Sequence, residues 1–307
     1  MKTKLTLVLL TTTLLAFPAM GCHEPQNLAM NVSSSSSPAA KSSSSPKVQA
    51  PSVQDTAAVS KSATETEGSW GHLTGTVTVD GNIAAQPLED VEGNKDKAVC
   101  LVDGKVPVDD NLVVNSDNKG LRDVYVYMYL KKKKTDLVHS SYAEKKKEPV
   151  VLDNVKCRFV PHAAFVRTGQ KLILKNSDPV GHNCHITTFN NEVNPNIPAN
   201  NQSTVTFDTD DSRPGKVVCD LHKWMDSVIF IRDNPYVAIT DADGKFTIEN
   251  LPEGEWDFQF WHKKAGYLKK LTIENYKVSK KGVATAKISD GETTDLGTMK
   301  LPTKSFK

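Results

Sequence analysis

Alternation of apolar and polar residues recurs along the chain after residue 70 and predicts β-strands. The clearest strand patterns lie at residues 73–79, 123–130, 171–175 and 217–231. The first of them ends at Asp80-Gly81, a dipeptide typical of hairpin turns. No window of eleven or more residues shows a helical period. Short strands separated by turn residues favour an all-β protein built as an antiparallel sandwich, with little helix.

The N-terminus follows a different pattern. Residues 1–4 are basic, residues 5–17 are apolar, and small residues precede Cys22. An apolar run of this length is too short to span a bilayer as a helix, so we predict that residues 1–21 are a secretory signal peptide. The junction before Cys22 also resembles the bacterial lipobox, in which the cysteine becomes lipidated; simple export with a free or removed Cys22 is the alternative. We therefore expect a mature protein in the periplasm or cell envelope.

Residues 22–69 are rich in serine, proline and alanine and contain pure serine runs. Such a segment has too few large apolar side chains to offset the entropy of ordering. We predict a flexible tether that joins a lipid at Cys22 to the folded part. A tether of this kind suits a mobile carrier and any other tethered protein equally well.

Charge adds little to this description. The chain of 307 residues has a formal net charge of +2 and 24% charged residues, which is ordinary for an exported globular protein and does not suggest nucleic-acid binding. Lysines concentrate at residues 131–134 and 145–147, in a predicted hairpin or loop. A solvated edge that discourages strand aggregation is one interpretation, and docking to an acidic partner or an anionic lipid surface is the other.

The candidate chemistry lies in a Cys-x-x-His-x-x-Met string formed by Cys219, His222 and Met225, which His182 precedes by 37 residues. The short spacing lets Cys219 and His222 turn toward one metal, and the next three residues bring Met225 to its axial side. A thiolate, two imidazoles and a thioether are the ligands of a mononuclear blue-copper centre. Zinc gains little from a thioether, so Met225 is the residue that favours copper; a zinc site or a sandwich that has lost its metal are the alternatives.

The order of motifs resembles that of the plastocyanin/azurin-like cupredoxins. The similarity spans roughly residues 150–232. Its parts are a Phe-x-Pro strand at Phe159, a Val-x-x-Gly turn ending at Gly169, a strand ending in Asn176, the pair His182-Asn183, and the loop from Cys219 to Met225. The resemblance implies a Greek-key β-sandwich with one type 1 copper ion held by His182, Cys219, His222 and Met225. It also implies that Asn183 ties the two ligand loops together, and that the outer edge of His222 lies at a surface patch with Trp224.

The function implied is single-electron transfer between redox partners without substrate turnover. The partner would be another redox protein, such as a c-type cytochrome. The alternatives are a copper-binding or copper-delivery module and a non-redox envelope binding protein on the same scaffold. A copper enzyme is disfavoured, because the remaining histidines do not cluster for a second copper centre. These scattered histidines include His72, His139, His162 and His262.

The remaining predictions concern domains and cysteines. Residues 70–235 are predicted to form the cupredoxin-like domain with an N-terminal extension, and residues 236–307 a small β-sandwich segment. In that segment a Thr-Asp-x-x-Gly turn ending at Gly244, an alternating Phe-x-Ile strand at Phe246 and a Leu-Pro-x-Gly turn ending at Gly254 resemble the carboxypeptidase-regulatory type. Export permits a disulfide, for which Cys100 and Cys157 are the favoured pair; with Cys184 as a third candidate, the other two pairings stay open. We interpret Cys184 and His185 as structural, with Cys184 in the core below the metal.

Overall fold

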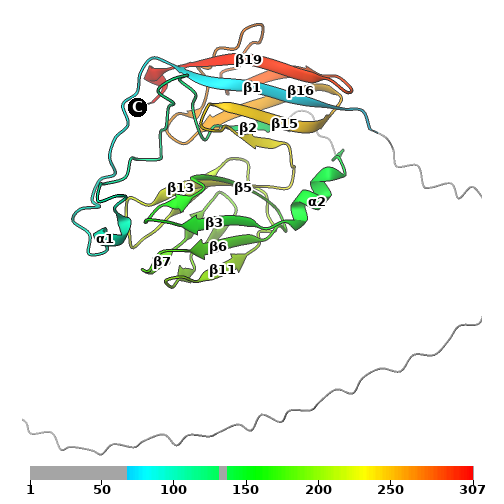
Figure 1. The fold of residues 1–307 in the computed structure, drawn as a ribbon. Helices are drawn as coiled ribbons and strands as arrows, with labels where there is room; N and C mark the ends of the chain where they lie inside the picture. Colours follow the sequence, from blue (N-terminus) through cyan, green and yellow to red (C-terminus); the bar gives the residue numbers. More distant parts are fainter. Residues whose placement is uncertain (1–67, 131–136, 307) are drawn as a thin grey trace, which may run out of the picture. The chain divides into compact units, whose positions relative to one another are not determined.

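The computed structural model describes residues 68–130 and 137–306 (Figure 1). The regular secondary structure of these residues is mostly β-strand with little helix, which confirms the predicted all-β class. The predicted signal peptide, the lipidation candidate Cys22, nearly all of the tether and Lys131 to Lys134 lie outside the described residues. Within the two described ranges, no helix has the length and apolar character needed to cross a membrane.

The first β-sandwich carries the candidate metal ligands and consists of two sheets. One sheet has the order β11-β6-β3-β4, and the other has the order β5-β13-β12-β8-β9. Apolar side chains from both sheets, such as Leu174 and Ile229, meet in one buried core. The strands are β3 (Val150–Asn154), β4 (Phe159–Val160), β5 (Ala163–Arg167), β6 (Leu172–Asn176), β8 (His185–Thr187), β9 (Glu192–Val193), β11 (Gln202–Val205), β12 (Gly215–Val218) and β13 (Asp226–Arg232). A separate pair, β7 (His182–Asn183) and β10 (Asn196–Ile197), lies at one end.

The second β-sandwich combines a three-stranded sheet, β15-β1-β19, with a sheet in which β2 and β16 are central. Strand β1 alternates strictly between buried and half-buried residues, so Leu73, Val77 and Val79 fill a core of their own. The strands are β1 (Trp70–Asp80), β2 (Tyr125–Met128), β14 (Val237–Ile239), β15 (Lys245–Pro252), β16 (Gly254–His262), β17 (Gly266–Tyr267), β18 (Val283–Ile288) and β19 (Thr293–Pro302).

The strand pairing differs from the predicted division at residue 235. Strands β1 and β2 precede the strands of the first sandwich in sequence, yet β1 pairs with β15 and β19, and β2 pairs with β14 and β16. The predicted hairpin at Asp80-Gly81 does not form, because both neighbours of β1 come from the C-terminal part of the chain. An alternating pattern specifies which face of a strand is buried but leaves its partner open.

The two sandwiches pack against each other through strands that are buried on both faces. In β13, Ile229 and Ile231 enter the core of the first sandwich, whereas Val228 and Phe230 face the second. The layer between the sandwiches contains Tyr125, Tyr127, Ala163, Val228 and Phe230. The hydroxyl of Tyr125 also donates to the carbonyl oxygen of Ala164 at 2.8 Å. Strand β2 contributes Tyr125 and Tyr127 to this layer, and its other two residues lie in the core of the second sandwich, so all four are buried.

Helices are few and short in the described ranges. They are α1 (Lys97–Cys100), α2 (Ser141–Lys147) and the 3-10 turn η1 (Thr303–Ser305). Residues 145–147, predicted within a hairpin or loop, form the last turn of α2, where Lys145 pairs with Glu249 at 3.0 Å. Helix α1 belongs to the long connection between β1 and β2, and its buried Cys100 joins the core of the first sandwich.

We predict that Phe230→Ala lowers the free energy of unfolding by about 3–5 kcal/mol. The ring is fully buried between the sandwiches and makes edge contacts with Tyr125 and Tyr127. Denaturant unfolding measures the change. The matched control is Phe189→Ala, since that ring is 71% exposed and its loss should change stability little. Equal effects of the two substitutions would contradict the packing described above.

Candidate metal centre

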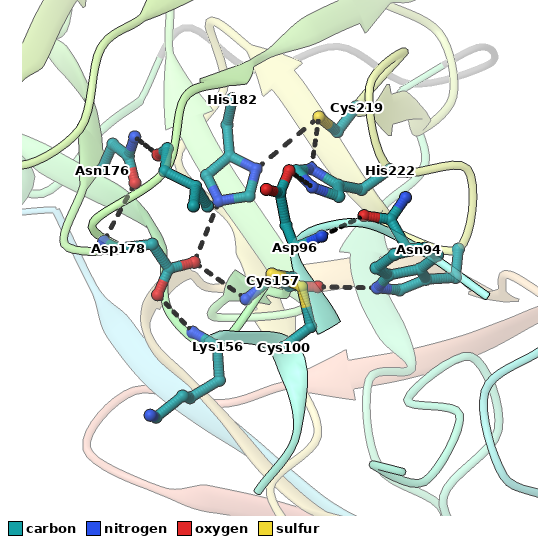
Figure 2. Close-up of a disulfide and its surroundings, with 12 residues drawn as sticks. Asn94, Asp96, Cys100, Lys156, Cys157, Asn176, Asp178, His182, Cys219 and His222 are labelled. Atoms are coloured by element: carbon teal, nitrogen blue, oxygen red, sulfur yellow. Dashed lines mark hydrogen bonds and ion pairs between the residues drawn. A yellow bond between two sulfur atoms is a disulfide. The ribbon is translucent and has the colours of Figure 1, made fainter. Parts of the chain in front are cut away.

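Three of the four predicted ligands converge at one end of the first sandwich. His182 lies in β7, Cys219 directly follows β12, and His222 lies on the loop before β13. The Cys219 Sγ is 3.8 Å from His182 Nδ1 and 3.7 Å from His222 Nδ1. Figure 2 shows both imidazole rings directed at this sulfur. All three residues are buried, with 1–2% exposure, so their donor atoms are shielded from solvent.

The fourth predicted ligand, Met225, closes the same loop. Its backbone N–H donates to the carbonyl oxygen of His222 at 2.8 Å, and its carbonyl oxygen accepts from Cys219 N at 3.1 Å. The Met225 side chain is 1% exposed and belongs to the hydrophobic cluster that also contains Cys219. These two hydrogen bonds fold the Cys-x-x-His-x-x-Met string into a compact turn between β12 and β13.

Asn183 connects the segment that carries His182 to the loop that carries Cys219. Its Oδ1 accepts a hydrogen bond from Asp220 N at 2.8 Å and lies 3.3 Å from Cys219 Sγ. Its Nδ2 donates to Asp220 Oδ2 at 2.7 Å and to Asn194 Oδ1 at 2.6 Å. The side chain therefore occupies the position that the resemblance assigned to it, between the two ligand-bearing segments.

A carboxylate lies within hydrogen-bonding distance of the outer nitrogen of each imidazole. His182 Nε2 lies 2.9 Å from Asp178 Oδ2, and His222 Nε2 lies 3.1 Å from Asp96 Oδ2. Histidines that bind metals commonly donate their other N–H to a carboxylate, which fixes the ring and leaves the inner nitrogen for the metal. Neither carboxylate was assigned a role from the sequence. Asp178 could have been suspected from its place four residues before His182, whereas Asp96 lies 126 residues from His222 and left no signal.

The disulfide joins Cys100 and Cys157, the pair favoured from the sequence, with a Cα–Cα distance of 4.9 Å. It lies against the centre: the donor atoms of Cys100, Cys157 and His222 are within 4.8 Å of one another. Cys184 remains a free, buried thiol. Its burial, and secondarily the charge on Cys219, raises its pKa well above the ordinary value. His185 instead lies near the surface with Asp220 and Glu192, so neither residue adds to the donor set.

The surface position expected for His222 is not observed. Its imidazole is 1% exposed, because residues around Asp96 cover its outer edge. Trp224 is half-buried, with its ring 5.3 Å from that of His222, and its Nε1 donates to the carbonyl oxygen of Cys157 at 3.2 Å. The long connection before β2, treated as an extension in the sequence, supplies this cover.

The other histidines lie apart from the centre. The His162 Nδ1 is 2.9 Å from Asp123 Oδ2, and burial lowers the pKa of His262 to about 4. Within residues 68–130 and 137–306, three groups of His, Cys, Asp and Glu are close enough to hold a metal, and each contains His182 or His222. The candidate metal chemistry of the described chain is therefore confined to one place.

The electrostatics of the centre favour a thiolate. Burial by itself would raise the pKa of Cys219, but hydrogen bonds from His182, His222 and nearby backbone N–H groups lower it to about 6. Burial likewise disfavours the charged form of His182, yet contacts with Asp178 and Cys219 raise its pKa to about 9. At neutral pH the metal-free centre thus holds a thiolate beside an imidazolium. The thiolate is the form of cysteine that binds metals.

No protein-family model matches the chain, and no curated protein matches it. Solved structures do match. A Cu-containing nitrite reductase (NirK) from Thermus scotoductus SA-01 is 14% identical over 34% of this chain and 25% of that chain, with a TM-score of 0.25. A reduced Cu(I) form of an amicyanin mutant is 16% identical over 31% of this chain and 86% of that chain, with a TM-score of 0.24. An oxidized amicyanin mutant is 17% identical over 27% of this chain and 81% of that chain, with a TM-score of 0.25. The chain thus spans about a quarter of the length of the nitrite reductase.

We predict that one thiol of the metal-free protein titrates near pH 6, when followed by the ultraviolet absorbance of the thiolate. The low pKa of Cys219 means that this thiolate persists above pH 6 and is lost below it. Cys219→Ser should remove the step, and Cys184→Ser should keep it, because burial holds Cys184 in its thiol form. A first titration near the ordinary thiol pKa would contradict the hydrogen bonding described for Cys219.

Proposed function

We propose that this protein binds one type 1 copper ion and carries single electrons between redox partners outside the cytoplasm. The observation that carries the proposal is the meeting of His182 Nδ1, His222 Nδ1 and Cys219 Sγ in the buried interior of the first sandwich. Met225, on the same loop, is the residue proposed as the weak axial ligand. When bound, copper would supply a one-electron couple between Cu(I) and Cu(II).

The donor set fits copper better than zinc. Structural zinc sites use four firm nitrogen or sulfur ligands, and among the residues that the structure describes three such donors converge here, His182, Cys219 and His222. A thioether completes a site for copper in both oxidation states but adds little for zinc. The carboxylates of Asp178 and Asp96 occupy the outer imidazole nitrogens, so both rings are aligned with their inner nitrogens toward the thiolate.

Burial of the ligands supports electron transfer over substrate chemistry. Electrons can cross a few ångströms of protein, whereas a substrate has to reach the metal. The side chains of His182, Cys219 and His222 are at most 2% exposed. Hydrogen bonds to Asn183, Asp178 and Asp96 restrict movement of the donor atoms, which keeps the reorganisation between the two oxidation states small.

The location and partners are part of the same proposal. The basic and apolar residues 1–17 and the small residues before Cys22 support export and a lipid anchor at Cys22. The proposed partner is another redox protein, such as a c-type cytochrome. The turn from Asp241 to Gly244 and the alternating strand β15 support the proposed likeness of the second sandwich to the carboxypeptidase-regulatory type.

The decisive test is addition of Cu(II) to the metal-free protein. We expect an intense blue or green band from charge transfer between the thiolate and copper, and we expect Cys219→Ser to abolish the band while the protein stays folded by circular dichroism. Cys184→Ser is the matched control and should keep the colour, because Cys184 lies outside the donor set. A colourless adduct in the unmodified protein would favour copper delivery or another binding role instead.

The role of Met225 has its own test. Met225→Leu preserves the volume of this buried side chain, so the protein should fold and bind copper. Removal of the electron-donating thioether should raise the reduction potential, as measured by redox titration of the coloured band. An unchanged potential would show that Met225 is not an axial ligand.

A further inference from the structure

The outer edge of His222 is covered by residues 91–101, here called the cap segment. Within it, Asp96 Oδ2 lies 3.1 Å from His222 Nε2. The exposed fraction of the His222 side chain is only 1%, against 22% for that of Asp96. Asp96 therefore stands between the imidazole and solvent, and no partner can contact this imidazole edge while the cap segment is in place.

The backbone around Asp96 is held by local hydrogen bonds. Its N–H donates to Asn94 Oδ1 at 2.9 Å, and its carbonyl oxygen accepts from Val99 N at 2.9 Å and from Cys100 N at 3.3 Å. The side chain of Val91 and the disulfide sulfur of Cys100 are buried in the core of the first sandwich. The backbone that carries Asp96 is thus anchored at both ends of the cap segment.

The disulfide fastens the cap segment to a turn that also holds His182. Lys156 and Cys157 both adopt a left-handed conformation, with φ of +53° and +52°, which is unfavourable for residues with a side chain. Asp178 accepts hydrogen bonds from both of their N–H groups, at 2.7 and 2.8 Å, and contacts His182 Nε2 at 2.9 Å.

A series of contacts links the two histidines, and Figure 2 shows its bonds from Asp178 to His182, across the disulfide and from Asp96 to His222, while the step from Cys100 to Asp96 is a backbone hydrogen bond. It runs from His182 through Asp178 to Cys157, across the disulfide to Cys100, and back through Asp96 to His222. The disulfide is the covalent link in this series. Neither end of it is exposed, since Cys100 and Cys157 are fully buried.

We propose that Asp96 is a positioning residue for His222, and that the disulfide-fastened cap segment closes the centre to exogenous ligands. Asp96 holds the outer nitrogen of His222, which directs the inner nitrogen at Cys219. The part of this proposal that concerns copper rests on the proposed function. The cap segment covers the donor atoms in the metal-free protein as well. The cap segment keeps small anions from the metal and thiol-alkylating reagents from the Cys219 sulfur.

The first test uses the full chain without metal and iodoacetamide as the probe. Labelling of Cys219, located by peptide mass spectrometry, should be slow in the unmodified protein and accelerate roughly tenfold or more in Asp96→Ala, because a hydrogen bond to a charged group is lost. Asp96→Asn should largely restore slow labelling, since its amide oxygen can still accept from Nε2. Glu92→Ala removes an exposed carboxylate from the same segment and is the matched control.

The second test asks whether the disulfide and Asp96 act as one unit. A double variant that lacks the disulfide, with Cys100→Ser and Cys157→Ser, should be labelled faster at Cys219. Adding Asp96→Ala to this double variant should change the labelling rate little. The acceleration should depend weakly on denaturant, as expected for local opening rather than global unfolding. Additive effects, or a denaturant dependence equal to that of unfolding, would overturn the cap.

The copper-loaded protein separates this proposal from the proposed function. Azide should alter the charge-transfer band of Asp96→Ala and leave that of the unmodified protein and of Asp96→Asn unchanged. If the protein binds no copper but labelling follows the expected order, the cap stands and the electron-carrier function fails. If the coloured site forms but Asp96→Ala changes neither labelling nor the response to azide, the function stands and the cap is wrong.

Discussion

The hydrogen bonds of Asn183 hold together the two chain segments that supply the donor atoms of the centre. His182 comes from β7, Cys219 and His222 come from the loop between β12 and β13, and no sheet hydrogen bonds are found between β7 and β12. The Asn183 side chain bridges the two through Asp220. The pairing of β8 with β12, with His185 opposite Val218, already brings these segments together, and the buried amide of Asn183 refines the placement of the donor atoms to a few tenths of an ångström.

The carboxylates add a second constraint, which acts on the orientation of the rings. An imidazole that binds a metal through one nitrogen keeps its proton on the other, and an acceptor at the outer nitrogen decides which of the two faces the metal. Asp178 and Asp96 provide that acceptor for His182 and His222 respectively. The thiolate of Cys219 then lies beside two rings of the same orientation, in surroundings that already favour its charged form.

Local patterns in the sequence were sufficient for much of the first sandwich. The positions of β6, β12 and β13, the compact loop at Cys219 and the role of Asn183 all depend on residues close in sequence or on one short motif. The cover over His222 could not be foreseen, because Asp96 meets the ring through a tertiary contact across 126 residues. The same limit applies to β1, whose alternation is compatible with any half-buried sheet.

The placement of β1 also has a consequence for how the chain folds. Among the described strands this one is synthesised first, and it becomes the centre of the β15-β1-β19 sheet. Its partner β19 lies near the other end of the chain, with Thr74 next to Asp295. Strands β3 to β13, which form the first sandwich, are complete well before that partner emerges. The second sandwich is therefore complete only after β19, the last of the described strands, has been synthesised. Pairings over such sequence separations form slowly, so the apolar face of β1 stays exposed until then.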